Sequence, residues 1–322
     1  DLNSRPDQSP SRWVINFRDW PLDRSAEGSW ERADEDRRTE WRRSGRVPKD
    51  YPGPVAADYP DCLEVVRTKV KPERDRNPRK QRRERWWQYA ERAPELYATI
   101  AGLERVLVTA QTSNKWAPAF QATDIVYSHT VVVFPISEWW HYVIMQSALH
   151  EHWRLEYGAS LKQDARYTPS DCYDTFPFPL PIPLEIGELG DRYHSARATL
   201  TRCREEGLTR LYTQFHDASS RKPDIGALRD LHVQLDLSAV RAYGWTDIEL
   251  NHGFHQTKQG IRFTISPAAR QEVLDRLLEL NHQRYREEVE QGLHDEANGR
   301  RKTSGRKRGR AAATSSPLLE GV

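Results

Sequence analysis

The spacing of apolar residues predicts little regular structure in the first hundred positions. Residues 13–17 form a short β-prone run. Residues 24–57 carry mixed charges and have no clean hydrophobic period, so we interpret them as an irregular insertion. Helical spacing follows Asp61, a candidate N-cap, and it recurs over 82–102, where Pro94 interrupts it.

The period then changes to one that is typical of strands. Three Val-rich runs, 105–109, 125–127 and 130–134, predict strands. The strongest helical pattern in the first half of the chain covers 138–157, and Gly158 is well placed to end that helix.

Prolines stand at alternate positions from 177 to 183, which excludes a helix and predicts extended backbone. We place a domain boundary at this stretch. Helical patterns follow over 187–206, 224–243 and 267–291. The predicted class is therefore α+β, with a mixed strand and helix domain over 1–180, a mainly helical region over 185–292, and a disordered basic tail over 296–322.

The charge is unevenly distributed, although 49 Lys and Arg against 47 Asp and Glu give a net charge of only +2. Residues 67–92 hold 11 basic and 4 acidic residues, and 300–310 hold 7 basic residues and no acidic one. Two basic stretches on an otherwise acidic chain are typical of a protein that binds a polyanion. A solvated charged helix face gives the same pattern, so this alternative stays open.

Several protein classes can be excluded. The longest apolar run, near 131–136, is too short for a membrane helix, and the polar start of the chain does not resemble a signal peptide. Three widely spaced cysteines favour neither a disulfide framework nor a zinc site, and they fit the cytoplasm. Because Met145 is the single methionine, we expect this chain to be a piece of a longer protein.

Motifs for several reactions on nucleotides and nucleic acids are absent from the sequence. It contains no G-x-x-x-x-G-K phosphate loop, no acidic residue two positions before a lysine, and no Pro-Pro. The last absence excludes an Asn-Pro-Pro-Tyr element, which holds an extruded base in amino-methyltransferases. We therefore expect no catalytic residues and no bound cofactor in this chain.

Two histidine pairs are weak candidates for metal ligands. His150 and His152 would point to different faces of a helix, so we interpret them as part of a solvated helix end. His252 and His255 lie on a Gly-containing segment without a neighbouring carboxylate or cysteine cluster, which favours a structural turn. No metal site is predicted.

Polar loops of the strand-rich part carry side chains that suit hydrogen bonds to base edges and phosphates. The longest is 158–171, and Ser113-Asn114-Lys115-Trp116 combines an amide, a cation and an aromatic ring. A packed connection and an ordinary turn are the alternative interpretations. The candidate DNA-binding residues are Lys115, Ser128, His129, Lys162, Arg166, Tyr167 and Thr168.

The basic run supplies candidate phosphate contacts, namely Arg74, Arg76 and Arg79. The tryptophans could stack on bases. We favour a packing role for the Trp86-Trp87 and Trp139-Trp140 pairs, as anchors between helices and sheet.

Several motifs, in order along the chain, resemble the C-terminal half of MmeI-like DNA methyltransferases. These are adenine-specific type II restriction–modification proteins of the single-chain kind. The motifs that carry the resemblance are Asp1-Leu2-Asn3-Ser4-Arg5-Pro6, Trp13-Val14-Ile15-Asn16-Phe17, Asp19-Trp20-Pro21, Tyr59-Pro60-Asp61-Cys62, Lys71-Pro72-Glu73-Arg74, Arg85-Trp86-Trp87-Gln88-Tyr89, Ser160-Leu161-Lys162, Arg166-Tyr167-Thr168-Pro169-Ser170-Asp171-Cys172, Thr175-Phe176-Pro177-Phe178-Pro179, His252-Gly253-Phe254-His255, Thr264-Ile265-Ser266 and Leu280-Asn281-His282-Gln283-Arg284-Tyr285.

The resemblance implies that 1–180 is a target-recognition domain and that 185–292 is the family's helical C-terminal region. It also implies a methyltransferase core, with its S-adenosylmethionine site, upstream in the parent protein and outside this chain. The 24–57 insertion is longer than the family leads us to expect, and no base can be assigned to any residue.

Three functions follow as hypotheses. The first is a module that recognises double-stranded DNA and positions an adenine for the parent's methyltransferase core. The second is an enzyme that acts alone on nucleic acid, which the missing motifs disfavour. The third is a separate specificity or scaffold subunit that docks on a partner methyltransferase.

Overall fold

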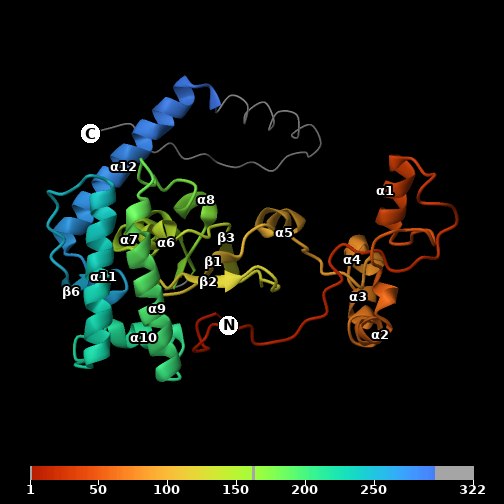
Figure 1. Cartoon of the computed structure of the whole chain (residues 1–322), viewed down its shortest axis with the longest axis horizontal. Helices are drawn as coiled ribbons and strands as arrows, with labels where there is room; N and C mark the ends of the chain where they lie inside the picture. Colours follow the sequence, from red (N-terminus) through yellow and green to blue (C-terminus); the bar gives the residue numbers. More distant parts are fainter. Residues whose placement is uncertain (1, 162–163, 294–322) are drawn as a thin grey trace.

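The computed structural model describes residues 2–161 and 164–293, which form a small N-terminal lobe and a larger body (Figure 1). We define the lobe as residues 13–92 and the body as residues 93–293 together with 2–9. The lobe contains four α-helices and a short 3-10 helix: α1 (Glu35–Ser44), η1 (Ala56–Asp58), α2 (Pro60–Lys69), α3 (Lys71–Asp75) and α4 (Lys80–Glu84).

The body combines strands and helices, so the predicted α+β class is confirmed. Its strands are β1 (Arg105–Ala110), β2 (Ala119–Ala122), β3 (Val131–Phe134), β4 (Ala159–Leu161), β5 (Asp164–Arg166), β6 (Gly253–Thr257) and β7 (Gly260–Thr264). Its helices are α5 (Pro94–Ile100), α6 (Trp139–Gln146), α7 (Ala148–Tyr157), α8 (Pro169–Cys172), η2 (Leu184–Ile186), α9 (Gly187–Cys203), α10 (Leu208–Phe215), α11 (Pro223–Ala242) and α12 (Pro267–Glu290). None of the helices in this described part is long and apolar enough to span a membrane.

The central sheet is antiparallel, in the order β2-β1-β3, and both of its faces are covered. Leu107 belongs to the main core of the body, whereas Val106 and Val108 face a smaller cluster with Ile100 of α5. A strand that is buried on both faces needs no polar positions, which explains its continuous Val-rich sequence. The prediction for β1 is therefore confirmed.

The strand predicted over 125–127 is wrong, because the partner of β1 comes earlier in the chain. Val108 pairs with Ala119 and Arg105 with Ala122, which places β2 at 119–122. The chain turns directly after β2, and Val126 remains 41% exposed.

The long helix predicted over 138–157 is two helices, α6 and α7. Ser147, at their junction, has extended backbone angles (φ −64°, ψ 158°). The Ala148 N–H that this break leaves free donates to Asp236 Oδ1 of α11 at 2.7 Å. A residue 88 positions away in sequence thus caps α7, so no local pattern could predict the break.

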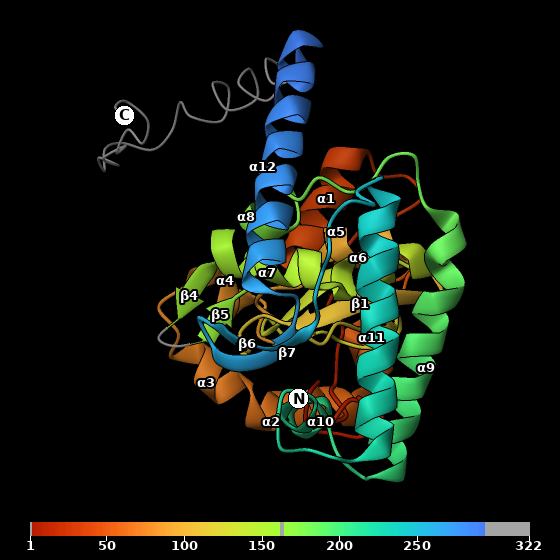
Figure 2. The same ribbon diagram turned by 90° about the vertical axis from the view of Figure 1, so that its left-hand side faces the viewer.

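The helical region does not have a core of its own. Helices α9 and α11 lie side by side against the strand-rich part (Figure 2), and the main cluster includes Leu107, Val143, Leu235 and Leu277. Phe176 of the proline-rich stretch is buried in the same cluster. The predicted boundary near residue 180 therefore joins two parts of one core, and α10 was not predicted.

The lobe differs from the sequence prediction in three places. The 24–57 insertion contains the regular helix α1, which Asp34 caps at its N-terminus and Gly45 ends with φ 78°. Residues 13–17 form no strand. Helix α2 begins with Pro60 after Tyr59, so Asp61 lies in its first turn and is not its N-cap.

The remaining helix predictions are confirmed in part. In the predicted helical stretch 82–102 the chain forms only the end of α4 and, from Pro94 onward, α5. The other predicted helices correspond to α9, α11 and α12. The predicted disordered tail, 296–322, lies outside the described residues.

Candidate nucleic-acid interface

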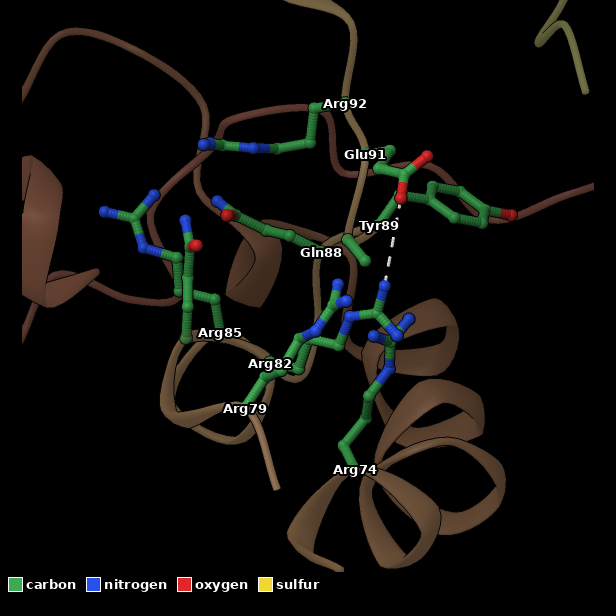
Figure 3. Close-up of a pocket in the computed structure, with 10 residues that line it drawn as sticks. Arg74, Arg79, Arg82, Arg85, Gln88, Tyr89, Glu91 and Arg92 are labelled. Atoms are coloured by element: carbon green, nitrogen blue, oxygen red, sulfur yellow. Dashed lines mark ion pairs between the residues drawn. The ribbon is translucent and has the colours of Figure 1, made fainter. Parts of the chain in front are cut away.

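An arginine-lined pocket lies in the lobe, where α3, α4 and the segment after α4 meet (Figure 3). Asn77 Oδ1 accepts the Arg79 N–H at 3.0 Å, which fixes the short turn between the two helices. The pocket has a volume of about 90 Å³, and its charged lining residues are Arg74, Arg79, Arg82, Arg85, Arg92 and Glu91.

The charge of this pocket is strongly positive, since five arginines face one glutamate. Figure 3 shows the Arg74, Arg79 and Arg82 side chains extending toward Glu91, but only Arg82 pairs with it, at 3.8 Å. Burial, followed by the charges of Arg92 and Arg43, lowers the pKa of Arg85. Arg85 donates to the carbonyl oxygens of Arg42 and Arg43 at the end of α1 and therefore stays within the lobe.

A second pocket, of about 410 Å³, lies between the lobe and the body. Arg74 and Arg92 line it from the lobe, and Tyr127, Ser128 and His129 line it from the loop before β3. Ser128 and His129 are exposed. The structure thus brings together three predicted contacts that lie far apart in sequence, Arg74, Ser128 and His129.

Two other predicted phosphate contacts lie close by. Arg79 is exposed and lines the arginine pocket. Arg76 is exposed at the C-terminal end of α3 and lines neither pocket. In the described part of the chain, no carboxylate pairs with Arg74, Arg76 or Arg79. Their charges are therefore available to an external anion.

The predicted residues of the 158–171 loop lie on and after the β4–β5 hairpin. In Figure 2 this hairpin lies on the same side of the molecule as α3 and α4, away from α9 and α11. Arg166 is exposed, and Thr168, the N-cap residue of α8, is half-buried. Lys162 lies outside the described residues. Of this group, Arg166 is the residue whose side chain is presented to solvent.

Tyr167 does not lie where a DNA ligand could reach its side chain, which corrects its prediction as a contact. It is 1% exposed, its ring stacks on Trp116 with centroids 5.3 Å apart, and its hydroxyl lies 2.9 Å from His150 Nε2. Burial raises its pKa above the ordinary value for tyrosine. Tyr167 therefore holds the end of the hairpin against the loop that contains Trp116.

Lys115, in that loop, is only 9% exposed, although its prediction as a DNA contact assumed a solvated cation. Its backbone N–H donates to Ser113 Oγ at 3.0 Å, and the Ser113 N–H donates to Ala165 O at 3.2 Å. These bonds tie the loop to β5. Burial, and after it the charge of Arg262, lowers the pKa of Lys115 to about 8.

Of the two histidine pairs, His150, His152 and His252 contact other elements of the body, and no metal-binding cluster of His, Cys, Asp and Glu occurs among the described residues. His150 and His152 are both buried, so the prediction of a solvated helix end is wrong. His152 Nε2 lies 3.0 Å from Thr264 Oγ1, and burial lowers the pKa of both histidines to about 3. His252 Nε2 lies 2.8 Å from Asp236 Oδ2, a carboxylate sixteen residues away that no local pattern places beside it.

Both tryptophan pairs pack in cores, but only Trp139-Trp140 lies between helix and sheet as predicted, with the Trp139 ring against Phe120 of β2. Trp86 and Trp87 are buried in a cluster of the lobe that contains no strand, and the Trp87 indole N–H donates to Trp20 O at 2.9 Å. Trp13 is the exception, because its side chain is fully exposed.

Arg82, Arg85 and Arg92 are pocket residues that were not among the predicted contacts, although they belong to the basic run and the composition already indicated them. Arg262 lies near Lys115, and Arg270 lies near Glu151, which also faces Lys115, but both arginines stand in isolated positions of the helical region. No local pattern marks them.

One comparison with known proteins agrees with the motifs. Residues 58–180 match the family described as MmeI, target recognition domain, so this part of the chain is similar to an MmeI target-recognition domain. No curated protein matches the chain. The solved structure titled "Structure of Type IIL restriction-modification enzyme MmeI in complex with DNA has implications for engineering of new specificities" matches with a TM-score of 0.49 and 16% sequence identity. The match covers 72% of this chain and 28% of that one.

Proposed function

We propose that this chain recognises a specific sequence in double-stranded DNA for a restriction–modification enzyme that methylates adenine at N6. The observation that carries this proposal is the position of the family match, 58–180, which contains every candidate contact from Arg74 to Thr168. The unpaired arginines of the two pockets supply the positive charge that DNA binding needs.

The two parts of the interface suit two kinds of contact. In the lobe, Arg76 and Arg79 are exposed, Arg74 is half-buried, and none of the three pairs with a carboxylate among the described residues, which favours contacts to phosphates. Hydrogen-bond donors of the body lie at the ends of its strands. Arg166 is the last residue of β5, and Ser128 and His129 lie in the loop before β3. Such positions on a rigid scaffold favour contacts to base edges. The body thus reads the sequence while the lobe holds the duplex.

Methyl transfer belongs, in this proposal, to a core outside this chain that uses S-adenosylmethionine. That core is part of the parent protein or of a partner subunit, and we propose the cytoplasm as the compartment. The proposal rests on the family resemblance and on the absence of methyltransferase motifs from this sequence.

The test is duplex binding by the whole chain as a function of salt concentration. We expect Arg74→Gln and Arg79→Gln each to weaken binding to all sequences alike and to lower the salt slope by about one. Arg192→Gln is the matched control, because Arg192 is exposed on α9, away from both pockets. Binding that ignores salt would contradict the proposal, and methylation by the chain alone would contradict the external core.

A library of random duplexes tests sequence selectivity. We expect one short motif to be enriched by the unmodified chain. Absence of any preference, combined with co-purification of a separate methyltransferase, would replace this proposal with a scaffold function.

A further inference from the structure

Three cations of the body lie within electrostatic range of one carboxylate, Glu151, which pairs with a fourth cation, and the group lies outside the two pockets described above. Lys115 follows β1, Arg262 lies in β7, Arg270 lies in the first turn of α12, and Arg154 and Glu151 belong to α7. The contact between His152 of α7 and Thr264 of β7 holds two of these elements together. We call Lys115, Arg262 and Arg270 the cationic cluster.

The nearby carboxylate does not neutralise this cluster. Glu151 Oε1 lies 3.7 Å from Arg154 NH2, and the 3%-exposed Arg154 guanidinium packs 4.7 Å over the Trp116 ring. In the described part of the chain, no ion pair includes Lys115, Arg262 or Arg270. With Arg154 and Glu151 cancelling each other, the cationic cluster retains three positive charges.

Polar atoms of the cluster also lack hydrogen-bond partners. The Nε atoms of Arg262 and Arg270 are buried without an acceptor. Among the described residues, the side chain of Arg270 makes one hydrogen bond, a long one of 3.4 Å from NH2 to Gln256 O. Lys115 is nine-tenths buried, and the bond that its residue makes to Ser113 uses the backbone N–H. Buried donors without acceptors are rare and costly in folded proteins.

The electrostatic environment of the cationic cluster is positive overall. Burial lowers the pKa of Arg262 and of Arg270, and the charge of Glu151 only partly opposes this. After burial itself, the charges of Arg262 and Lys115 are the largest causes that lower the pKa of His216. A group that is anionic at neutral pH would relieve the repulsion and would satisfy the free donors.

We propose that the cationic cluster binds one phosphodiester of the recognised DNA, and this inference rests on the proposed function. Arginine donates two parallel hydrogen bonds to phosphate oxygens, and lysine adds a compact charge, which together suit a tetrahedral anion with several oxygens. The Lys115 loop is bonded to β5, so a phosphate held here fixes the DNA backbone beside the hairpin that carries Arg166.

The inference extends the DNA interface beyond the target-recognition domain. Arg262 and Arg270 lie outside the matched residues 58–180, in the helical region. Because β7 and α12 pack on the same core as the recognition strands, the helical region then sets the register of the duplex.

The experiment compares Arg262→Gln/Arg270→Gln with the unmodified chain in duplex binding across a series of salt concentrations. The cluster is proposed to contact one phosphate, so loss of that contact lowers the salt slope by about 0.9. We expect affinity to fall at least tenfold for all sequences, while Arg192→Gln, at an exposed position of α9 outside the cluster, leaves it unchanged. An unchanged slope and affinity in the double variant would overturn the inference and leave the proposed function intact. Failure of the unmodified chain to bind any duplex would overturn both.

Thermal unfolding distinguishes a binding role from a structural one. Because the free cluster is repulsive, the double variant is expected to melt at the same temperature as the unmodified chain, or higher. A clear loss of stability would assign the arginines to the fold and overturn the inference. Inorganic phosphate serves as the second probe: stabilisation of the unmodified chain by phosphate, together with unchanged duplex binding by the double variant, would identify a site for the free ion instead.

Discussion

Arginine has opposite surroundings in the lobe and in the body. In the lobe, Arg79 is exposed, Arg74 is half-buried, and neither forms an ion pair among the described residues. In the body, Arg197 and Arg154 are almost fully buried, and Arg197 donates to Gln146, Tyr212 and the Pro118 carbonyl. Surface charge therefore shows in the composition of a short segment, whereas buried charge depends on residues that only the fold brings together.

The apolar cores of the lobe and of the body also differ, in size and in how many parts of the chain they join. The lobe has two small clusters, one around Trp86 and Trp87 and one around Trp41. The body has one main core that extends from Leu107 to Leu277. A small core gives little cooperative stability, so the lobe should respond locally to mutation and the body should respond as a whole.

The largest effect is expected from Asp236→Ala in the body. Asp236 is fully buried and accepts from Ala148 N–H and from His252, and His232 Nε2 lies 3.6 Å from Asp236 Oδ2. Removing this partner should cost about 3–5 kcal/mol of unfolding free energy, measured in a denaturant titration. Asp230→Asn, at an exposed position of the same helix, is the control. A cost below about 1 kcal/mol for Asp236→Ala would show that the network does not couple α7 to α11.

Trp41→Ala tests the independence of the lobe. Trp41 is 6% exposed, packs with Val47 and Val55, and lies below the Arg37 guanidinium. Loss of this ring should cost about 3 kcal/mol, but only within the lobe. Hydrogen exchange should accelerate in 24–57 and remain unchanged in β1 and α11. Equal acceleration in both regions would mean that lobe and body unfold as one unit.

Lys115→Met should give a smaller effect of the opposite sign. Lys115 has a pKa of about 8 in the folded chain and of 10.5 in its ordinary state, so folding disfavours its charged form. The variant should gain about 1–2 kcal/mol at pH 7 and lose DNA affinity. Below pH 8 the folded chain carries the full penalty of the charge, and between pH 8 and 10.5 the penalty disappears. The difference in stability between variant and unmodified chain should therefore shrink over that range, and a constant difference would contradict the assigned cause.

Local pattern was sufficient where a residue acts with its sequence neighbours. The Val-rich run of β1, the helical periods of α11 and α12, and the basic run around Arg74 all follow from spacing and composition. The break at Ser147 did not, because its cap comes from Asp236. The burial of Tyr167 could not be predicted from local pattern either, because its position depends on the ring of Trp116, fifty-one residues earlier.

The path of the chain at its N-terminus has a mechanical consequence. Asn3 O accepts the Thr209 N–H at 3.1 Å, and a side chain at Gly207 would collide with Asn3 and Ser4, so the first residues are seated on α10 before the chain leaves for the lobe. The chain returns to the body at α5. Two chain segments therefore connect the lobe to the body, one held on α10 and one at α5. With two fixed connections, the lobe is expected to rotate as a hinge about the axis through them.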